Sequence, residues 1–457
     1  MGNLMTSLLD TASALKAYEG ALAVTQNNVT NANTAGYAKQ RASLEAMPFD
    51  LTVGMPGGVS LGLTQSSRNG FAEQAVRDQQ TALGYYQQKA SDLSPLQNYF
   101  SLSSSSGIAP AISNLFQSFS QLSVNPNDTV SRQAVLDQAN VVAEAFQETA
   151  NGLLTQGSNM DQQTRSVIDN VNHLAGQIAE INTQNRVDPQ GGVDAGIDAQ
   201  LNAALEQLSQ LVNFTALQQP NGTVSVYIGG QTPLVVDDQV YAIQGDFSTP
   251  QTAIDSSTGA DISGQLTGGQ LSALLDDKNN NLPSYVNDLN TLAQSLAQQV
   301  NDTLNGGIDQ NGGAPVTDLF QFDATTGAAL TITVNPLTPD QIAAAIPGSP
   351  GGNENALNLA ALANTKALNG YTFAQFYGNL GGHVGSDLSA ATDSQSTKEA
   401  LLSQAQSMRQ QLSGVSLDEE AQYMIEYQRS YQAMSKMLGI LNSVTDTLMN
   451  MMGVATT

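Results

Sequence analysis

The feature that most constrains this chain is an unbroken heptad pattern near its C-terminus. Between residues 424 and 452, seam positions alternate in steps of three and four, and all but one are apolar or aromatic. These positions are Met424, Tyr427, Tyr431, Met434, Leu438, Leu441, Thr445, Leu448 and Met452. The spacing places the side chains on one stripe of an α-helix and predicts that this stripe packs against another helix. Ser416 and Glu419 form a capping box at its start, with Asp418 and Glu420 also in the first turn.

The N-terminus carries a second, weaker heptad pattern, in a helix predicted at residues 4–33. Its apolar positions recur every seven residues, with Thr11, Tyr18 and Thr25 between them. The predicted seam consists of Leu8, Leu15, Leu22 and Val29. Helices of this kind are marginally stable in isolation. We therefore expect both ends to order by packing on each other and on neighbouring subunits; the alternative is an ordinary helix pair within one globular chain.

Between the terminal helices, the pattern predicts long helices interrupted by two β-rich or irregular segments. Helical periodicity is found at residues 71–99, 109–122, 128–156, 159–185, 197–213, 268–278, 283–305, 355–366, 371–381 and from 386 to the end. Between 213 and 244 the period changes to two, with Gly-rich turns, which predicts short strands. The Gly-, Pro- and Asn-rich segment 306–355 contains one predicted strand, 329–334.

We therefore predict a mainly α fold. It is a long helical bundle with the N- and C-terminal heptad helices brought together, plus smaller β-rich inserted domains. The predicted parts are a terminal coiled-coil assembly region (1–35 and 430–457), a helical bundle domain (36–213, 263–305 and 355–429), a β-rich insert (214–262) and an irregular or β insert (306–354).

The composition limits the partners and the chemistry. The 40 acidic and 15 basic residues give a net charge of −25, and so negative a surface repels nucleic acid and anionic membranes. The chain has no cysteine, which excludes disulfides and thiolate chemistry. The N-terminus lacks the basic and apolar regions of a cleavable signal peptide. No run reaches the roughly 18 to 20 apolar residues that span a bilayer.

Candidate catalytic and metal-binding residues are scarce. The two histidines, His173 and His383, have no partner at metal-ligand spacing. The acidic pair Asp276-Asp277 is predicted at the C-terminal end of a helix, beside Lys278. We find no nucleotide-binding loop and no hydrolase or metalloprotease motif. We predict no catalytic site, no cofactor and no metal.

The N-terminal helix ends in a recognisable motif. Residues 21–37, ALAVTQNNVTNANTAGY, resemble the signature shared by flagellar rod, hook and hook-associated proteins, although Ala35 replaces the usual proline. The matching residues are Asn27, Asn28, Asn31, Asn33, Gly36 and Tyr37. Gly36 also suits the end of the helix, where glycine is the preferred residue.

The C-terminus narrows the resemblance to the hook-associated protein 1 family. Residues 413–421, SGVSLDEEA, and 427–433, YQRSYQA, are similar to the closing signature of that family. The matching residues are Asp418, Glu419, Glu420, Tyr427, Gln428, Tyr431 and Gln432. The segments 268–275 and 353–357 also resemble the family, whereas the segment that begins at Asp198 departs from it.

The resemblance implies a structural subunit rather than an enzyme. Members of the family are exported unfolded by the flagellar type III apparatus and assemble as a ring at the extracellular hook–filament junction. The implied partners are other copies in the ring, the hook protein, the next hook-associated protein towards the filament, and an export chaperone at the C-terminal helix. Nucleic acid and membrane are not among them.

Two other classes of function stay open at this point. A flagellar hook or distal rod protein shares the N-terminal motif, but it generally lacks the Asp418-Glu419-Glu420 form of the closing signature. A secreted surface-binding protein could share the acidity and the β-rich inserts, but it does not need heptads at both ends.

Overall fold

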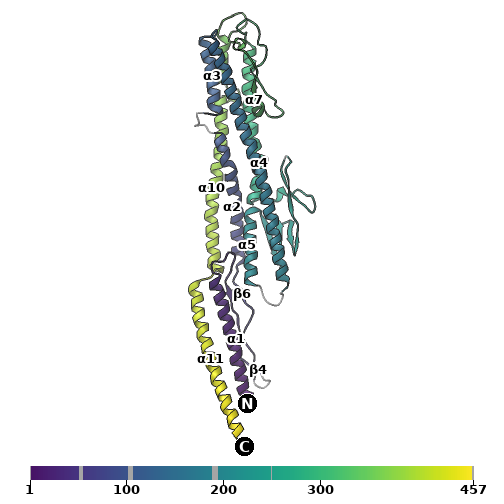
Figure 1. Ribbon diagram of the computed structural model, residues 1–457, viewed down its shortest axis with the longest axis vertical. Coiled ribbons are helices and arrows are strands. Elements are labelled where there is room, and N and C mark those ends of the chain that lie inside the picture. Colours follow the sequence, from purple (N-terminus) through teal and green to yellow (C-terminus); the bar gives the residue numbers. More distant parts are fainter. Residues whose placement is uncertain (1, 51–54, 101–105, 188–193, 249, 455–457) are drawn as a thin grey trace.

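The structure is a computed structural model, and it describes residues 2–50, 55–100, 106–187, 194–248 and 250–454. The molecule is elongated, and both chain ends lie at the same end of its long axis (Figure 1). There the first helix, α1 (Gly2–Thr30), runs beside the last helix, α11 (Leu417–Val454). The remaining long helices form a longer body that continues from this pair.

The body is a helical bundle around a large apolar core, with a second, smaller apolar cluster beside it. Its helices are α2 (Gly70–Tyr99), α3 (Ile108–Val124), α4 (Thr129–Val187), α5 (Ala195–Leu211), α6 (Gly269–Asp276), α7 (Leu282–Asn305), α9 (Glu354–Ala361) and α10 (Phe373–Ser413). In α7, Leu289, Leu292, Leu296 and Val300 form the buried stripe expected of an amphipathic helix. The predicted mainly α class is confirmed. In the described part of the chain, no helix has the length and apolarity required to cross a membrane.

The helices predicted on either side of residue 157 are a single helix, α4. A glycine in a helix interior costs about 1 kcal/mol relative to alanine. Here a contact across the bundle offsets that cost, because Lys278 Nζ donates to the carbonyl of Gly157 at 2.9 Å and pairs with Asp161 at 2.8 Å. The core-facing residues continue through the whole segment, so packing against the rest of the bundle keeps the chain helical across Gly157.

Two further predicted breaks are absent. Helix α10 begins at a capping box formed by Thr372 and Gln375 and runs through the predicted break between 381 and 386. Buried Tyr377, Leu380 and Val384 hold it against the core there. Helices α6 and α7 are joined by a π-helical turn, Asp277–Asn281, rather than by a loop.

A narrow β arm lies along α1. Its strands are β1 (Gln40–Arg41), β2 (Leu44–Ala46), β3 (Phe49–Asp50), β4 (Met55–Pro56), β5 (Val59–Leu61) and β6 (Gln65–Ser66), paired antiparallel as β1–β6, β2–β5 and β3–β4. Gly20 of α1 leaves room for Leu61 of the arm, since a Cβ atom at Gly20 would lie 2.4 Å from Leu61 Cδ2. The arm and all of α11 lie with α1, outside the bundle (Figure 1). The domain boundaries at 36 and 430 stay a prediction.

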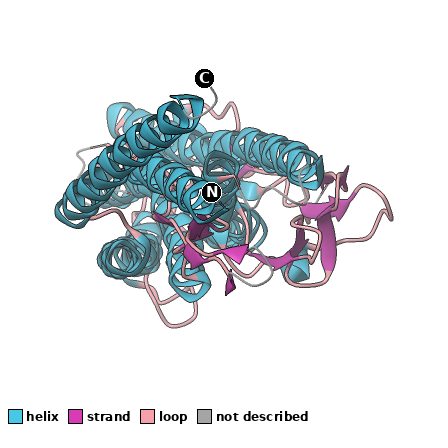
Figure 2. Cartoon of the chain, turned by 90° about the horizontal axis from the view of Figure 1, so that it is seen from below, coloured by secondary structure: helices cyan, strands magenta, loops and turns pink. Residues whose placement is uncertain are grey.

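The predicted β-rich insert at 214–262 projects to one side of the bundle (Figure 1 and Figure 2). It comprises β7 (Phe214–Gln218), β8 (Val224–Ile228), β9 (Thr232–Val236) and β10 (Gln239–Val240) in the order β10-β9-β8-β7, followed by the hairpin of β11 (Ile243–Asp246) and β12 (Thr252–Asp255). Two asparagines of α4 hold it. Asn182 exchanges two hydrogen bonds of 2.8 Å with the backbone of Val224, and Asn172 exchanges two of 2.9 Å with the backbone of Ile243.

The segment 306–354 is mostly irregular and lies at the far end of the body. It contains β13 (Phe320–Gln321), the short helix α8 (Ala328–Thr331) and β14 (Thr333–Val334). The strand predicted at 329–334 is thus wrong over its first half. The Asn290 carboxamide explains the difference, because its Oδ1 accepts the Ala329 N–H at 2.9 Å and supports a helical turn there.

Candidate functional site

The terminal helices pack along the predicted seam of α11. After Glu420, the half-buried residues of this helix are Met424, Tyr427, Ser430, Tyr431, Met434, Leu438, Leu441 and Thr445, and the described side chains between them are exposed. The rings of Tyr427 and Tyr18 in α1 lie 6.4 Å apart. Leu448 is 42% exposed, and Met452 lies outside the described side chains. The seam thus faces α1 over most of its length.

The buried face of α1 includes Thr11 and Thr25, which alternate with the leucines in the predicted heptad pattern. Leu8, Leu15, Leu22 and Val29 are only half-buried. The buried residues are Thr11, Ala14, Ala17, Ala21, Thr25 and Asn28. Small side chains allow close approach of the neighbouring backbone, and the buried hydroxyl of Thr25 donates to the carbonyl of Ala21 at 3.1 Å. The face that α1 buries within the chain is thus built from alanine, threonine and asparagine, and the assembly role of the half-buried leucines stays a prediction.

Helix α11 also presents apolar side chains on its solvent side. Ile425, Met437, Ile440, Val444, Met449 and Met451 are each between 41% and 68% exposed. Extended apolar surface on a soluble chain marks a contact with another molecule. Helix α11 is therefore apolar both towards α1 and away from it.

Asn28 joins the end of α1 to the start of α11 and to the β arm. Its Nδ2 donates to Glu420 Oε2 at 3.0 Å and to the Gln40 carbonyl at 2.8 Å. Its Oδ1 accepts from the Gln40 N–H at 2.9 Å and from the Tyr37 hydroxyl at 2.8 Å. Asn28 and Glu420 are 1% and 2% exposed, so the amide's hydrogen-bonding capacity is used inside the protein. Burial, with the charge of Glu420, raises the pKa of Tyr37 to about 12.

A second set of contacts ties the arm to the turn between α10 and α11. Lys39 Nζ pairs with Glu419 at 2.7 Å, and this ammonium holds the pKa of Glu419 below its usual range. The Lys39 N–H donates to the carbonyl of Ser413 at 2.9 Å. The Ser413 hydroxyl accepts the N–H of Asn69 at 2.9 Å. The last residue of α10 is thus bonded to both ends of the arm.

An ion cluster lies where the arm enters the body. Arg68 pairs with Glu73 and with Asp198 of α5, each at 2.6 Å. Arg409 of α10 pairs with Glu73 at 3.2 Å and with Glu206 of α5 at 2.7 Å. Glu73, which is 5% exposed, therefore bridges two arginines. The cluster joins α2, α5 and α10 beside the terminal pair.

Gly36 is held against this cluster. Its carbonyl accepts from Arg68 Nη2 at 2.6 Å. Its φ of +73° is in the left-handed region, and a Cβ atom there would lie 2.3 Å from the carbonyl oxygen of Ala199. Only glycine meets both requirements. Helix α1 ends at Thr30, so Gly36 closes the turn after the helix rather than the helix itself.

The other signature residues are more peripheral. Asn31 donates to the carbonyl of Asn27 at 3.1 Å and to its side chain, which stabilises the end of α1. Asn33, Asp418, Gln428 and Gln432 are exposed. The structure therefore brings together Asn28, Tyr37 and Glu420, holds Gly36 and Glu419 in neighbouring contacts, places Tyr427 and Tyr431 on the seam towards α1, and leaves Asn33, Asp418, Gln428 and Gln432 exposed.

Sequence reasoning missed the ion cluster. Arg68, Glu73, Glu206 and Arg409 belong to no motif, and apart from the Arg68–Glu73 pair their partners are far apart in the chain. Of the residues in the cluster, only Asp198 lies in a segment that the sequence singles out, and there it marks the start of a departure from the family. The scarcity of basic residues is a weak indication of the cluster, because Arg68 and Arg409 are two of only 15.

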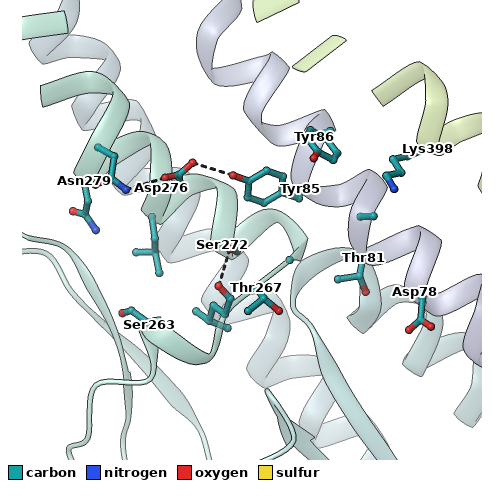
Figure 3. Close-up of a pocket in the computed structure, with 15 residues that line it drawn as sticks. Asp78, Thr81, Tyr85, Tyr86, Ser263, Thr267, Ser272, Asp276, Asn279 and Lys398 are labelled. Atoms are coloured by element: carbon teal, nitrogen blue, oxygen red, sulfur yellow. Dashed lines mark hydrogen bonds between the residues drawn. The ribbon is translucent and has the colours of Figure 1, made fainter. Parts of the chain in front are cut away.

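A polar pocket of about 740 Å³ lies between α2, α6 and the base of the β insert (Figure 3). Its polar side chains are engaged with one another. The Tyr85 hydroxyl donates to Asp276 Oδ2 at 2.9 Å, and Lys89 Nζ donates to the same oxygen at 2.8 Å. Ser272 donates to the carbonyl of Leu266 at 2.9 Å. Within the described ranges, no group of three or more His, Asp or Glu side chains is placed to hold a metal ion.

Known proteins resemble this chain over almost its whole length. Residues 93–320 match the family model of the flagellar hook-associated protein FlgK helical domain, and 403–451 match that of the flagellar basal body rod FlgEFG protein C-terminal region. Flagellar hook-associated protein 1 of Bacillus subtilis is 29% identical, over 96% of this chain and 97% of that protein. The Escherichia coli protein of the same name is 26% identical, over 98% and 100%.

A solved structure shares the fold. The flagellar hook junction protein FlgK from Burkholderia pseudomallei superposes with a TM-score of 0.67 at 17% identity, over 74% of this chain and 99% of that one.

Paired terminal helices, a β arm and a long helical body define a structural protein of the flagellar axis. Within that class, the chain belongs to the flagellar hook-associated protein 1 family.

Proposed function

We propose that this chain is a secreted structural subunit that joins hook to filament in the extracellular flagellum and assembles as a ring through α1 and α11. The proposal of a ring rests on one observation: α11 presents apolar side chains both towards α1 and towards solvent. A helix needs a partner for each apolar face, and α1 covers only one of them. A neighbouring copy provides the second contact, and it also covers the half-buried leucines of α1.

The partners follow from this arrangement. The hook protein lies on one side of the ring and the next hook-associated protein on the other, and their own terminal helices continue the same packing. The exposed face of α11 also serves as the binding surface for an export chaperone before assembly. Because this face is apolar, a bound chaperone prevents aggregation of the unassembled subunit.

The function is structural rather than enzymatic. Asn28, Gly36, Tyr37, Glu419 and Glu420 connect the terminal helices to each other, to the β arm and to the body. Their hydrogen bonds are made within the protein, which suits the transmission of force between the terminal pair and the body.

Deletion of the gene tests the role in the cell. We expect cells with hooks but without filaments, and flagellin released into the medium. A gene that lacks the codons for 417–457 should fail to restore filaments. Normal filaments after deletion contradict the proposal and favour a surface-binding protein, and missing hooks favour a hook or rod protein.

A variant on the solvent side of α11 tests ring assembly. Ile440 is 63% exposed, so Ile440→Asp should leave the monomer's circular dichroism and thermal midpoint unchanged while abolishing filament attachment. Ser435→Asp, at an exposed polar position of the same helix, is the matched control and should assemble. Equal assembly of the two variants contradicts a subunit contact on this face.

A further inference from the structure

Two aspartates face each other inside the body, where α2 meets the π-helical turn between α6 and α7. Asp92 and Asp277 are both 0% exposed, and their carboxyl groups lie within hydrogen-bonding reach of each other. The sequence pattern placed Asp277 at a helix end beside Lys278. The π-helical turn instead directs it into the bundle.

Each carboxyl group has one oxygen satisfied and one without a donor. Gln88 Nε2 donates to Asp92 Oδ1 at 2.9 Å, and Asn281 Nδ2 donates to Asp277 Oδ1. In the described part of the chain, no donor reaches Oδ2 of either aspartate. Two buried carboxylates without a donor between them repel each other, whereas a single proton converts the contact into an O–H···O hydrogen bond.

The surrounding charges do not neutralise a doubly ionised pair. From α2, Lys89 Nζ lies 3.8 Å from Asp277 Oδ1, but it donates to Asp276 at 2.8 Å. From α10, Asp387 adds a further negative charge, and it accepts the hydroxyl of Tyr285 of α7. Lys278 is paired with Asp161 of α4.

The remaining neighbours from α4 are neutral. Gln163 Oε1 accepts from Gln88 at 2.6 Å, and Gln156 donates to the Asp92 carbonyl at 3.2 Å.

We propose that Asp92 and Asp277 form a buried proton-binding site, in which the two carboxyl groups share one proton at neutral pH. Burial, together with the neighbouring carboxylate, raises the pKa of Asp92 above its usual range, and burial also raises that of Asp277. The two groups titrate as a pair. This proposal does not depend on the role proposed above for the chain in the flagellum.

Proton binding by this pair makes the stability of the folded chain depend on pH. The unfolded chain releases these protons near pH 4, whereas the folded chain holds at least one of them to higher pH. The folded state therefore binds more protons between these limits, and stability falls as the pH rises. The stabilisation is complete below pH 4 and is lost as the pH rises through the folded pKa values.

Thermal unfolding of the full chain between pH 5 and 8.5 tests the proposal. Asp92→Asn keeps the shape of the group and mimics its protonated form, so the variant should unfold about 2 °C or more above the wild type at pH 8.5. Its midpoint should also depend less on pH. Asp137→Asn removes an exposed carboxylate from α4 and should keep the wild-type slope. Parallel pH dependence of wild type and Asp92→Asn overturns the proposal.

Infrared spectroscopy reports the protonation state directly rather than through thermal stability. At pH 7 the wild-type protein should show the carbonyl band of a protonated carboxylic acid, and the double variant Asp92→Asn/Asp277→Asn should lose it. Absence of the band from the wild type overturns the proposal.

Discussion

Asn28, near the end of the first helix, donates a 3.0 Å hydrogen bond to Glu420 in the first turn of the last helix, across 392 residues of chain. Both side chains are buried. The same amide bonds to Tyr37 and to the backbone of Gln40. One side chain thus sets the relative positions of α1, α11 and the β arm.

Asn28→Ala should loosen the terminal pair without unfolding the body. The change leaves the buried Glu420 carboxylate and the Gln40 backbone groups without a partner, which costs about 1–3 kcal/mol. Amide hydrogen exchange should therefore accelerate in residues 2–30 and 417–454 and stay unchanged in α4 and α7. Asn27→Ala, at an exposed position one residue earlier, is the control. Equal effects from the two changes would argue against a specific role for Asn28.

Gly36→Ala should destabilise the connection between the arm and the body. The left-handed φ alone costs alanine about 1 kcal/mol, and its Cβ would approach the Ala199 carbonyl to 2.3 Å. Differential scanning calorimetry should show a lower midpoint. Gly176→Ala provides the contrast, because nothing lies within 4 Å of a Cβ there. That variant replaces a helical glycine by alanine and should be stabilised by up to about 1 kcal/mol. A fall for both variants would point to a general sensitivity to alanine.

Glu73→Gln should destabilise the ion cluster severely. The carboxylate is buried and pairs with Arg68 at 2.6 Å and with Arg409 at 3.2 Å. Its neutralisation removes a buried ion-pair partner from both arginines and leaves each with a single carboxylate, and breaking such a buried pair costs about 3 kcal/mol. Urea unfolding should reveal the loss. Glu399→Gln, at an exposed position of α10, should change stability by less than about 0.5 kcal/mol. A similarly small effect at Glu73 would show that the cluster adds little to stability.

Tyr37 should ionise later than an ordinary tyrosine. Its pKa is raised to about 12 by burial and by the charge of Glu420. Because the folded pKa is above the unfolded value of about 10, the associated stability is complete below pH 10 and is lost as the pH rises towards 12. The phenolate absorbance of the wild type minus that of Tyr37→Phe should stay near zero up to about pH 11. A full phenolate signal at pH 10 would contradict the burial of this hydroxyl.

Much of the fold could be predicted because the sequence patterns that indicate its helices and strands involve residues only a few positions apart. The stripe of α11 repeats without a slip, and the side chains at its positions from Met424 to Thr445 are those that the structure half-buries. The alternation at 224–228 predicted a strand that β8 confirms. Predicted breaks at Gly157 and near His383 failed because contacts across the bundle outweigh the small cost of a helical glycine.

The composition of the contact faces explains the remaining differences between the predicted and the observed structure. The buried face of α1 consists of alanine, threonine and asparagine, which hydrophobicity does not distinguish from a solvent-facing stripe. The π-helical turn at Asp277 lies between α6, which packs against α2, and α7, and local sequence contains no sign of it.

By itself, the sequence determined the helical class, the seam of α11, the β-rich insert and the two terminal signatures, since each depends on neighbours a few residues apart. Only the tertiary structure decided which signature residues meet, which face of α1 is buried, and that Arg68, Glu73 and Arg409 form a cluster. These relationships join residues hundreds of positions apart, and their energies come from burial and charge pairing that exist only once the helices are assembled.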